Sequence, residues 1–111
     1  MIKAEGQFIH GMGGVKEFEV HLMTADDAIG ALEEALINEG SEVTSLRVRQ
    51  YEMARMLTVG GRSVMVEQVK GMLAMDYDIA NTAAVDLEKK LRELASQTPA
   101  GSKAAASPTT R

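Results

Sequence analysis

Five residues in the middle of the chain could together bind an anionic ligand. A guanidinium group binds phosphate through paired hydrogen bonds, and an aromatic ring can stack on a nucleobase. If residues 42–52 form a strand, its arginines and its tyrosine share one face, because alternate side chains of a strand point the same way. One hypothesis is therefore a binding module for an anionic small molecule, a nucleotide or single-stranded RNA. Its residues are Arg47, Arg49, Tyr51, Arg55 and Arg62.

The uneven distribution of charge offers a second explanation for these arginines. Residues 17–46 carry eight acidic side chains and no Lys or Arg, which gives −8, whereas residues 47–70 carry five basic and two acidic ones, which gives +3. On the predicted sheet, the basic strand faces Glu5, Glu17 and Glu19 of the first two strands. Cross-strand pairs of opposite charge contribute roughly 0.2–1 kcal/mol each. We therefore favour charge pairing, within the sheet or between subunits, over ligand binding.

Methionine is concentrated in the same half of the chain. Its side chain is flexible and polarisable, so it suits adaptable contact surfaces as well as gaps in a core. The clustering favours a subunit or partner interface. The residues are Met53, Met56, Met65, Met72 and Met75.

Other residue types that carry chemistry are few or unsuitably placed. The two histidines, His10 and His21, are expected on opposite faces of a hairpin, too far apart to share a metal ion. The glycine-rich segment 11–14 joins two predicted strands, so no helix N-terminus follows it to bind a phosphate. The chain has no cysteine, which excludes a disulfide framework and a thiolate metal site. We predict no catalytic residues, no metal and no cofactor, and hence a protein that is not an enzyme.

The elements that must position these residues begin with a β-hairpin. Residues 2–10 and 16–23 alternate apolar and polar side chains, which is typical of strands with one buried face. Keeping the two apolar faces together predicts that Phe8 lies opposite Phe18, with a connecting loop of about five residues.

An acidic helix is predicted over residues 25–39. Thr24 can cap its N-terminus, and Gly40 can end it. One apolar stripe is expected to pack on the sheet, where the small residues of the first strand leave room. The stripe consists of Ala28, Ile29, Leu32, Ala35 and Leu36.

Residues 42–66 are predicted to add strands to the sheet. Residues 42–52 alternate as a third strand, and residues 53–59 either continue it or form a fourth strand. The pair Gly60–Gly61 favours a two-residue hairpin, although Ser63 could instead cap a helix.

Residues 66–96 show the spacing of helices. Apolar residues recur three, four and seven positions apart, and residues 76–78 are a candidate break, with Asp78 as the cap of a second helix. Residues 98–111 consist mostly of Pro, Gly, Ala, Ser and Thr, which predicts a disordered tail after a single domain of residues 1–97.

Together these elements predict an α+β fold. It contains a small antiparallel or mixed sheet of three to five strands in the order β-β-α-β-(β)-α. The acidic helix packs on one face, and a C-terminal helix or helix pair completes the domain.

The expected function is that of a non-enzymatic protein that assembles into homo-oligomers. The chain has two Phe, two Tyr and no Trp, so its core is small and association would bury further surface. Its main partner is expected to be a second copy, before another protein, with nucleic acid or nucleotide less favoured. A phage-type structural or accessory protein has this composition. No apolar run is long enough for a membrane span, so we expect no membrane partner and a cytoplasmic location, or a particle assembled there.

Overall fold

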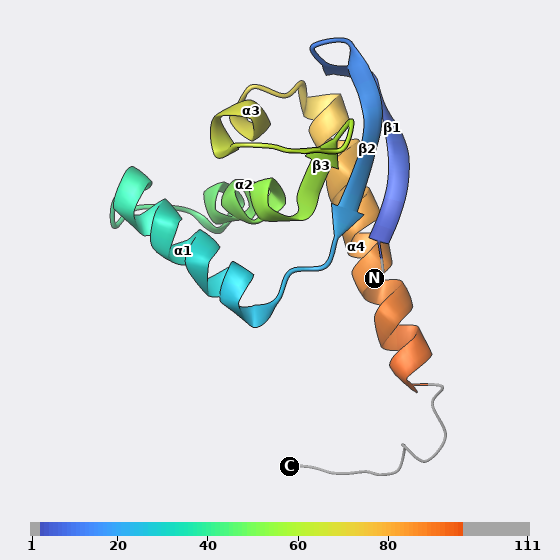
Figure 1. Cartoon of the computed structure of the whole chain (residues 1–111). Helices are drawn as coiled ribbons and strands as arrows, with labels where there is room; N and C mark the ends of the chain where they lie inside the picture. Colours follow the sequence, from blue (N-terminus) through green and yellow to red (C-terminus); the bar gives the residue numbers. More distant parts are fainter. Residues whose placement is uncertain (1–2, 97–111) are drawn as a thin grey trace.

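The protein has an α+β fold with an antiparallel sheet, as expected from the sequence. The structure is a computed structural model that describes residues 3–96. Its four strands lie in the order β1-β2-β3-β4, and the helices lie beside the sheet (Figure 1). The elements are β1 (Lys3–Met12), β2 (Val15–His21), α1 (Ala25–Glu39), α2 (Ser45–Met56), β3 (Leu57–Val59), β4 (Arg62–Ser63), α3 (Val66–Lys70) and α4 (Ala74–Ser96).

The first hairpin forms with a register two residues away from the predicted one. Gly6, and not Phe8, lies opposite Phe18. The strands are joined by Gly13 and Gly14, both with positive φ, and such a tight turn replaces the expected five-residue loop. The extra residues of β1 form an irregularity between Gln7 and Met12. A shift of two residues leaves Phe8, Phe18 and Val20 buried, as predicted, and the two phenylalanine rings still stack, with centroids 4.4 Å apart.

Helix α1 begins and ends as predicted. The Thr24 hydroxyl accepts a hydrogen bond from the Asp27 backbone at 3.1 Å, and the Asp27 carboxylate accepts one from the Thr24 backbone at 3.1 Å. Gly40 follows the last turn with φ 90° and donates its backbone N–H to Leu36.

The predicted third strand over residues 42–52 is wrong, because this segment belongs to helix α2. Thr44 caps the helix by accepting a hydrogen bond from the Arg47 backbone at 3.1 Å. Nine of the twelve residues of α2 are Leu, Arg, Gln, Glu, Met or Ala, which have high helix propensity. Only Val48 is β-branched, so the short alternation around it was a misleading signal.

The second hairpin forms at Gly60–Gly61, as predicted. Thr58 pairs with Ser63, which excludes the alternative of Ser63 as a helix cap. The helical region after it is broken at residues 71–73, before the predicted position at residues 76–78.

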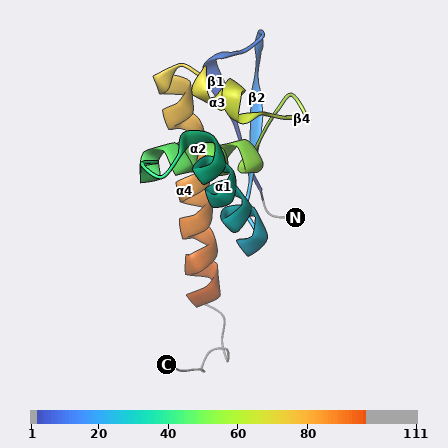
Figure 2. The ribbon, with the colours of Figure 1, turned by 90° about the vertical axis from the view of Figure 1, so that its left-hand side faces the viewer.

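Helix α2 lies between two groups of buried side chains. Met53 and Met56 belong to the larger group, which joins the sheet, α2, α3 and α4. Tyr51 belongs to the smaller group, in which α1, α2 and α3 meet. Helix α4 crosses the inner face of the sheet, while α1 lies on the far side of α2 (Figures 1 and 2). The acidic helix therefore packs on α2 and not on the sheet. The space above Gly6, which was predicted to leave room for this helix, is filled by the ring of Phe18.

Within residues 3–96, no helix is both long and apolar enough to cross a membrane. The predicted tail, residues 98–111, lies outside the described residues, so its boundary with the domain stays a prediction.

Candidate functional site

Arg47 and Arg49 of α2 point to different neighbours and do not share a face. Arg49 donates to Asn81 of α4 at 2.9 Å and to Glu52 at 3.0 Å. Arg47 lies 3.8 Å from Glu39 of α1. Residues two positions apart on a helix diverge by about 200°, whereas the predicted strand aligned them. The strand face that was predicted to align Arg47, Arg49 and Tyr51 is therefore absent.

Tyr51 is buried, and its hydroxyl is already engaged. It donates to Glu39 at 2.6 Å, and Lys70 of α3 donates to the same carboxylate oxygen at 2.5 Å. The Lys70 ammonium also lies 5.5 Å from the centre of the Tyr51 ring. The hydrogen bond from Lys70 is the main cause that lowers the pKa of Glu39, and the same bond raises the pKa of Lys70. The Glu39 carboxylate raises the pKa of Tyr51. The cluster joins three helices, and its tyrosine ring is not available to a base.

Arg55 pairs with the acidic helix. Its guanidinium lies 3.4 Å from Glu34 and 4.0 Å from Asp27. Gly30 leaves room for it, because a Cβ there would lie 3.0 Å from the guanidinium nitrogens. The remaining predicted ligand residue, Arg62, is exposed on β4 and stands apart from the others. Charge pairing between the acidic residues of segment 17–46 and the basic residues of segment 47–70 is thus present within the chain. It joins α1 to α2 and α3 instead of joining strands.

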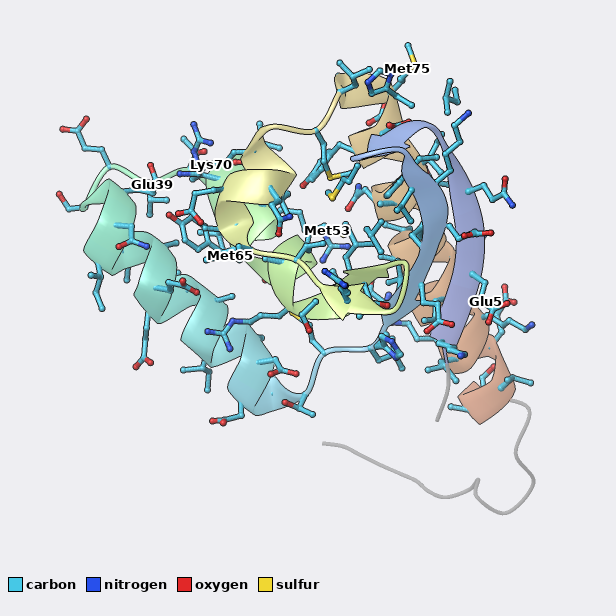
Figure 3. The ribbon with its side chains drawn as sticks, turned by 45° about the horizontal axis from the view of Figure 1, so that its top comes forward. Glu5, Glu39, Met53, Met65, Lys70 and Met75 are labelled. Carbon is cyan, nitrogen blue, oxygen red and sulfur yellow. The ribbon has the colours of Figure 1, made fainter. Side chains whose placement is uncertain are left out.

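The methionines divide between core and surface. Met53 and Met56 are fully buried, and Met72 is partly buried against the same core. Met65 and Met75 are 67% and 52% exposed, but they lie well apart (Figure 3). The five residues therefore do not form one interface, and the flexible side chains of Met53 and Met56 fill the space around α2 instead.

One buried carboxylate, of the kind that often marks a functional site, was not identified from the sequence. Asp76 is buried in the first turn of α4 and accepts hydrogen bonds from the backbone N–H groups of Ile9, His10 and Gly11 at 2.9–3.2 Å. Burial alone raises the pKa of Asp76, but the three backbone donors outweigh it, so the pKa lies below its usual value. The carboxylate holds the irregular end of β1 on α4. No local sequence signal distinguishes it from Asp78, because its donors are more than sixty residues away.

Metal binding has no support among the described residues. They contain no group of three or more His, Asp or Glu side chains that could hold an ion.

A groove of about 600 Å³ crosses the outer face of the sheet and is lined by Glu5, Glu17 and Glu19. Lys3 lies 2.9 Å from Glu19 and 3.5 Å from Glu5, so part of this negative charge is already paired.

The outer side of α1 is an apolar surface that the fold does not explain. The predicted stripe of this helix is divided, because its Ala35 is buried against α2 while Ile29, Leu32 and Leu36 are 57%, 44% and 44% exposed. Ala31, which was not part of the predicted stripe, is buried beside Ala35. Large apolar side chains normally face the core of a helical pair. Here the small residues do so, and within residues 3–96 no other element lies over the outer side of α1 (Figure 2).

The exposed residues follow the spacing of a helix-pairing seam. Apolar residues recur at intervals of three and four along α1 and the segment before it, and we call this set of residues the docking seam. It consists of Leu22, Ala25, Ile29, Leu32 and Leu36.

A groove continues the docking seam toward α4. It has a volume of about 360 Å³, and its apolar lining comes from both sides. Leu91 extends the buried stripe of α4 beyond the sheet, while Glu88 and Arg92 carry opposite charges beside it. The groove is lined by Leu22, Met23, Thr24, Ala25, Ala28, Glu88, Leu91 and Arg92.

Comparisons with protein-family models, with curated proteins and with solved structures found no match to this chain.

Proposed function

We propose that this chain is a non-enzymatic interaction protein that docks a helix of another polypeptide on the docking seam. The observation that carries this proposal is the inverted packing of α1. Its alanines, Ala31 and Ala35, face the protein, and its large aliphatic residues face outward. A helix placed on the seam would complete the apolar packing that residues 3–96 leave open.

The size of the seam is consistent with reversible docking. Full burial of an aliphatic side chain contributes about 1.5–3 kcal/mol, and about half of that area is still exposed in Ile29, Leu32 and Leu36. Completing the burial of all three contributes roughly 2–4 kcal/mol before the cost of association. The groove beside α4 adds further area for the same helix. Assembly functions, including the phage-type structural role expected from composition, require a surface of this kind.

The non-enzymatic part of the proposal is supported by the state of the polar groups. Glu39, Tyr51 and Lys70 are bonded to one another between three helices. Asp76 is fully used by backbone donors. These groups are among those with shifted pKa values, and each has a structural task.

A synthetic helix tests the docking function without knowledge of the natural partner. The probe is a fluorescent peptide, stapled into a helical monomer, with Leu at its seam positions and Gln beside them. Fluorescence anisotropy should show saturable binding to the wild type. Leu32→Asp should weaken it by roughly tenfold or more, because a charge enters the centre of the seam.

Leu46→Asp is the matched control for this experiment. Leu46 is 80% exposed and lies on α2, away from the docking seam. Its substitution has the same chemistry and should leave the affinity unchanged. Equal loss in both variants, or no binding to the wild type by any seam peptide, would contradict the docking function.

A further inference from the structure

Resting on the docking function above, we propose that the docked segment is an amphipathic helix with Lys or Arg along one edge of its apolar side, and not a second copy of this chain. The charges beside the docking seam distinguish these two occupants. Helix α1 carries five acidic residues and no basic residue, and the structure separates these acids into two groups.

The first group is neutralised inside the chain. Asp27 and Glu34 face Arg55, and Glu39 faces Lys70 and Arg47. These three carboxylates lie on the side of α1 that meets α2 and α3.

The second group lies along the docking seam. Asp26 and Glu33 are exposed and stand seven residues apart, so they lie on the same edge of the helix. Among residues 3–96, neither side chain forms an ion pair or a hydrogen bond. On the opposite edge, the groove is lined by one acidic and one basic side chain, Glu88 and Arg92, so the charges there sum to zero. The seam therefore has one acidic edge and one neutral edge.

Docking of α1 on α1 of a second copy conflicts with this pattern. In an antiparallel pair related by a two-fold axis, each edge of the seam meets the same edge of the other copy. When Ile29 packs on Leu32 of the other copy, Asp26 comes close to its Glu33. Like charges at such positions repel. In a parallel pair, Asp26 and Glu33 come close only to alanines of the other copy. Neither arrangement therefore provides these two carboxylates with a cation.

A helix with basic residues on the matching edge satisfies both acids. Its Lys or Arg side chains can cover the seam with their aliphatic stems while their charged ends reach Asp26 and Glu33. The apolar seam then supplies the affinity, and the acidic edge selects the partner and its direction.

Three stapled peptides with the same Leu seam and with Lys, Gln or Glu at the flanking positions test this inference. The wild type should bind the Lys peptide about threefold to tenfold more tightly than the Gln peptide at low salt, and the Glu peptide most weakly. High salt should reduce these differences. The double variant Asp26→Asn/Glu33→Gln should lose the preference for Lys while keeping its affinity for the Gln peptide.

The control for general attraction is the double variant Glu17→Gln/Glu42→Gln. It removes the same charge from exposed positions away from the docking seam and should retain the preference for Lys. An equal loss of preference in this variant overturns the inference, as does equal binding of the three peptides by the wild type.

Sedimentation of the wild type covers the remaining outcomes. A dimer that high salt strengthens and Leu32→Asp disrupts shows that a second copy occupies the seam, which keeps the docking function and overturns this inference. A monomer that binds none of the three peptides overturns the docking function itself.

Discussion

Single residues in this protein act mainly by joining elements that are distant in sequence. Asp76 holds the irregular end of β1 on α4 by accepting from three successive backbone N–H groups. Glu39 joins α1 to Tyr51 of α2 and Lys70 of α3. In both cases a carboxylate that could have suggested catalysis is already saturated by donors, so its role is structural.

At this scale we predict that Asp76→Asn destabilises the fold. An amide offers one acceptor oxygen for three donors, so the melting temperature at pH 7 should fall by about 5 °C or more. The pKa of Asp76 is lowered in the folded state, so its stabilising effect is complete above the unfolded value of about 3.9 and is lost as pH falls through the folded value.

Thermal unfolding of wild type and Asp76→Asn between pH 7 and pH 2 checks this sign. The difference in melting temperature should stay constant from pH 7 to about pH 5 and shrink below about pH 4. A difference that is absent at pH 7, or that grows toward low pH, contradicts the assignment.

The elements follow local signals where those signals are strong. The capping box of Thr24 begins helix α1, and the pair Gly60–Gly61 forms the turn between β3 and β4, as expected. Helix α2 was missed because it is buried on two sides, so its apolar residues do not form the single stripe that identifies a surface helix. The hairpin register was missed because the irregularity of β1 depends on Asp76, which belongs to another element.

Gly6 provides a test of the observed register. A Cβ at this position would lie 2.7 Å from the Phe18 ring, which is buried and stacked on Phe8. Gly6→Ala should therefore lower the free energy of unfolding by about 1–3 kcal/mol. Gly71→Ala is the control, because its φ is −87° and a Cβ there would lie 3.5 Å or more from its neighbours. Urea denaturation should show a near-wild-type midpoint for the control, and a similar midpoint for Gly6→Ala would contradict the register.

The whole molecule consists of two apolar groups that share α2. The larger group unites the sheet with α4, whereas the smaller one holds α1 through Ala31, Ala35, Tyr51 and Val66. The part that carries the docking seam is therefore attached by fewer buried side chains than the rest. Such a part opens more readily than the main core.

We expect hydrogen exchange to reveal this difference. Val66→Ala removes two methyl groups from the smaller group and should cost roughly 1–3 kcal/mol in local stability. Amides of α1 should then exchange faster, while those around Ala80 and Leu87 of α4 should keep their protection. A uniform acceleration over both helices would show that the two groups open together and would contradict this picture.

Local signals in the sequence determined the α+β class, the bounds of α1 and the turn at Gly60–Gly61, since caps, turn residues and periodicity act between near neighbours. The helix propensity of residues 45–56 also favoured a helix, although the short alternation around Val48 concealed it. The tertiary structure alone decided that the arginines of α2 pair with α1 and α4. It also decided that α1 turns its alanines inward and leaves Ile29, Leu32 and Leu36 exposed. These outcomes depend on which elements meet, and contacts over many residues leave no periodic signal within the segments that they position.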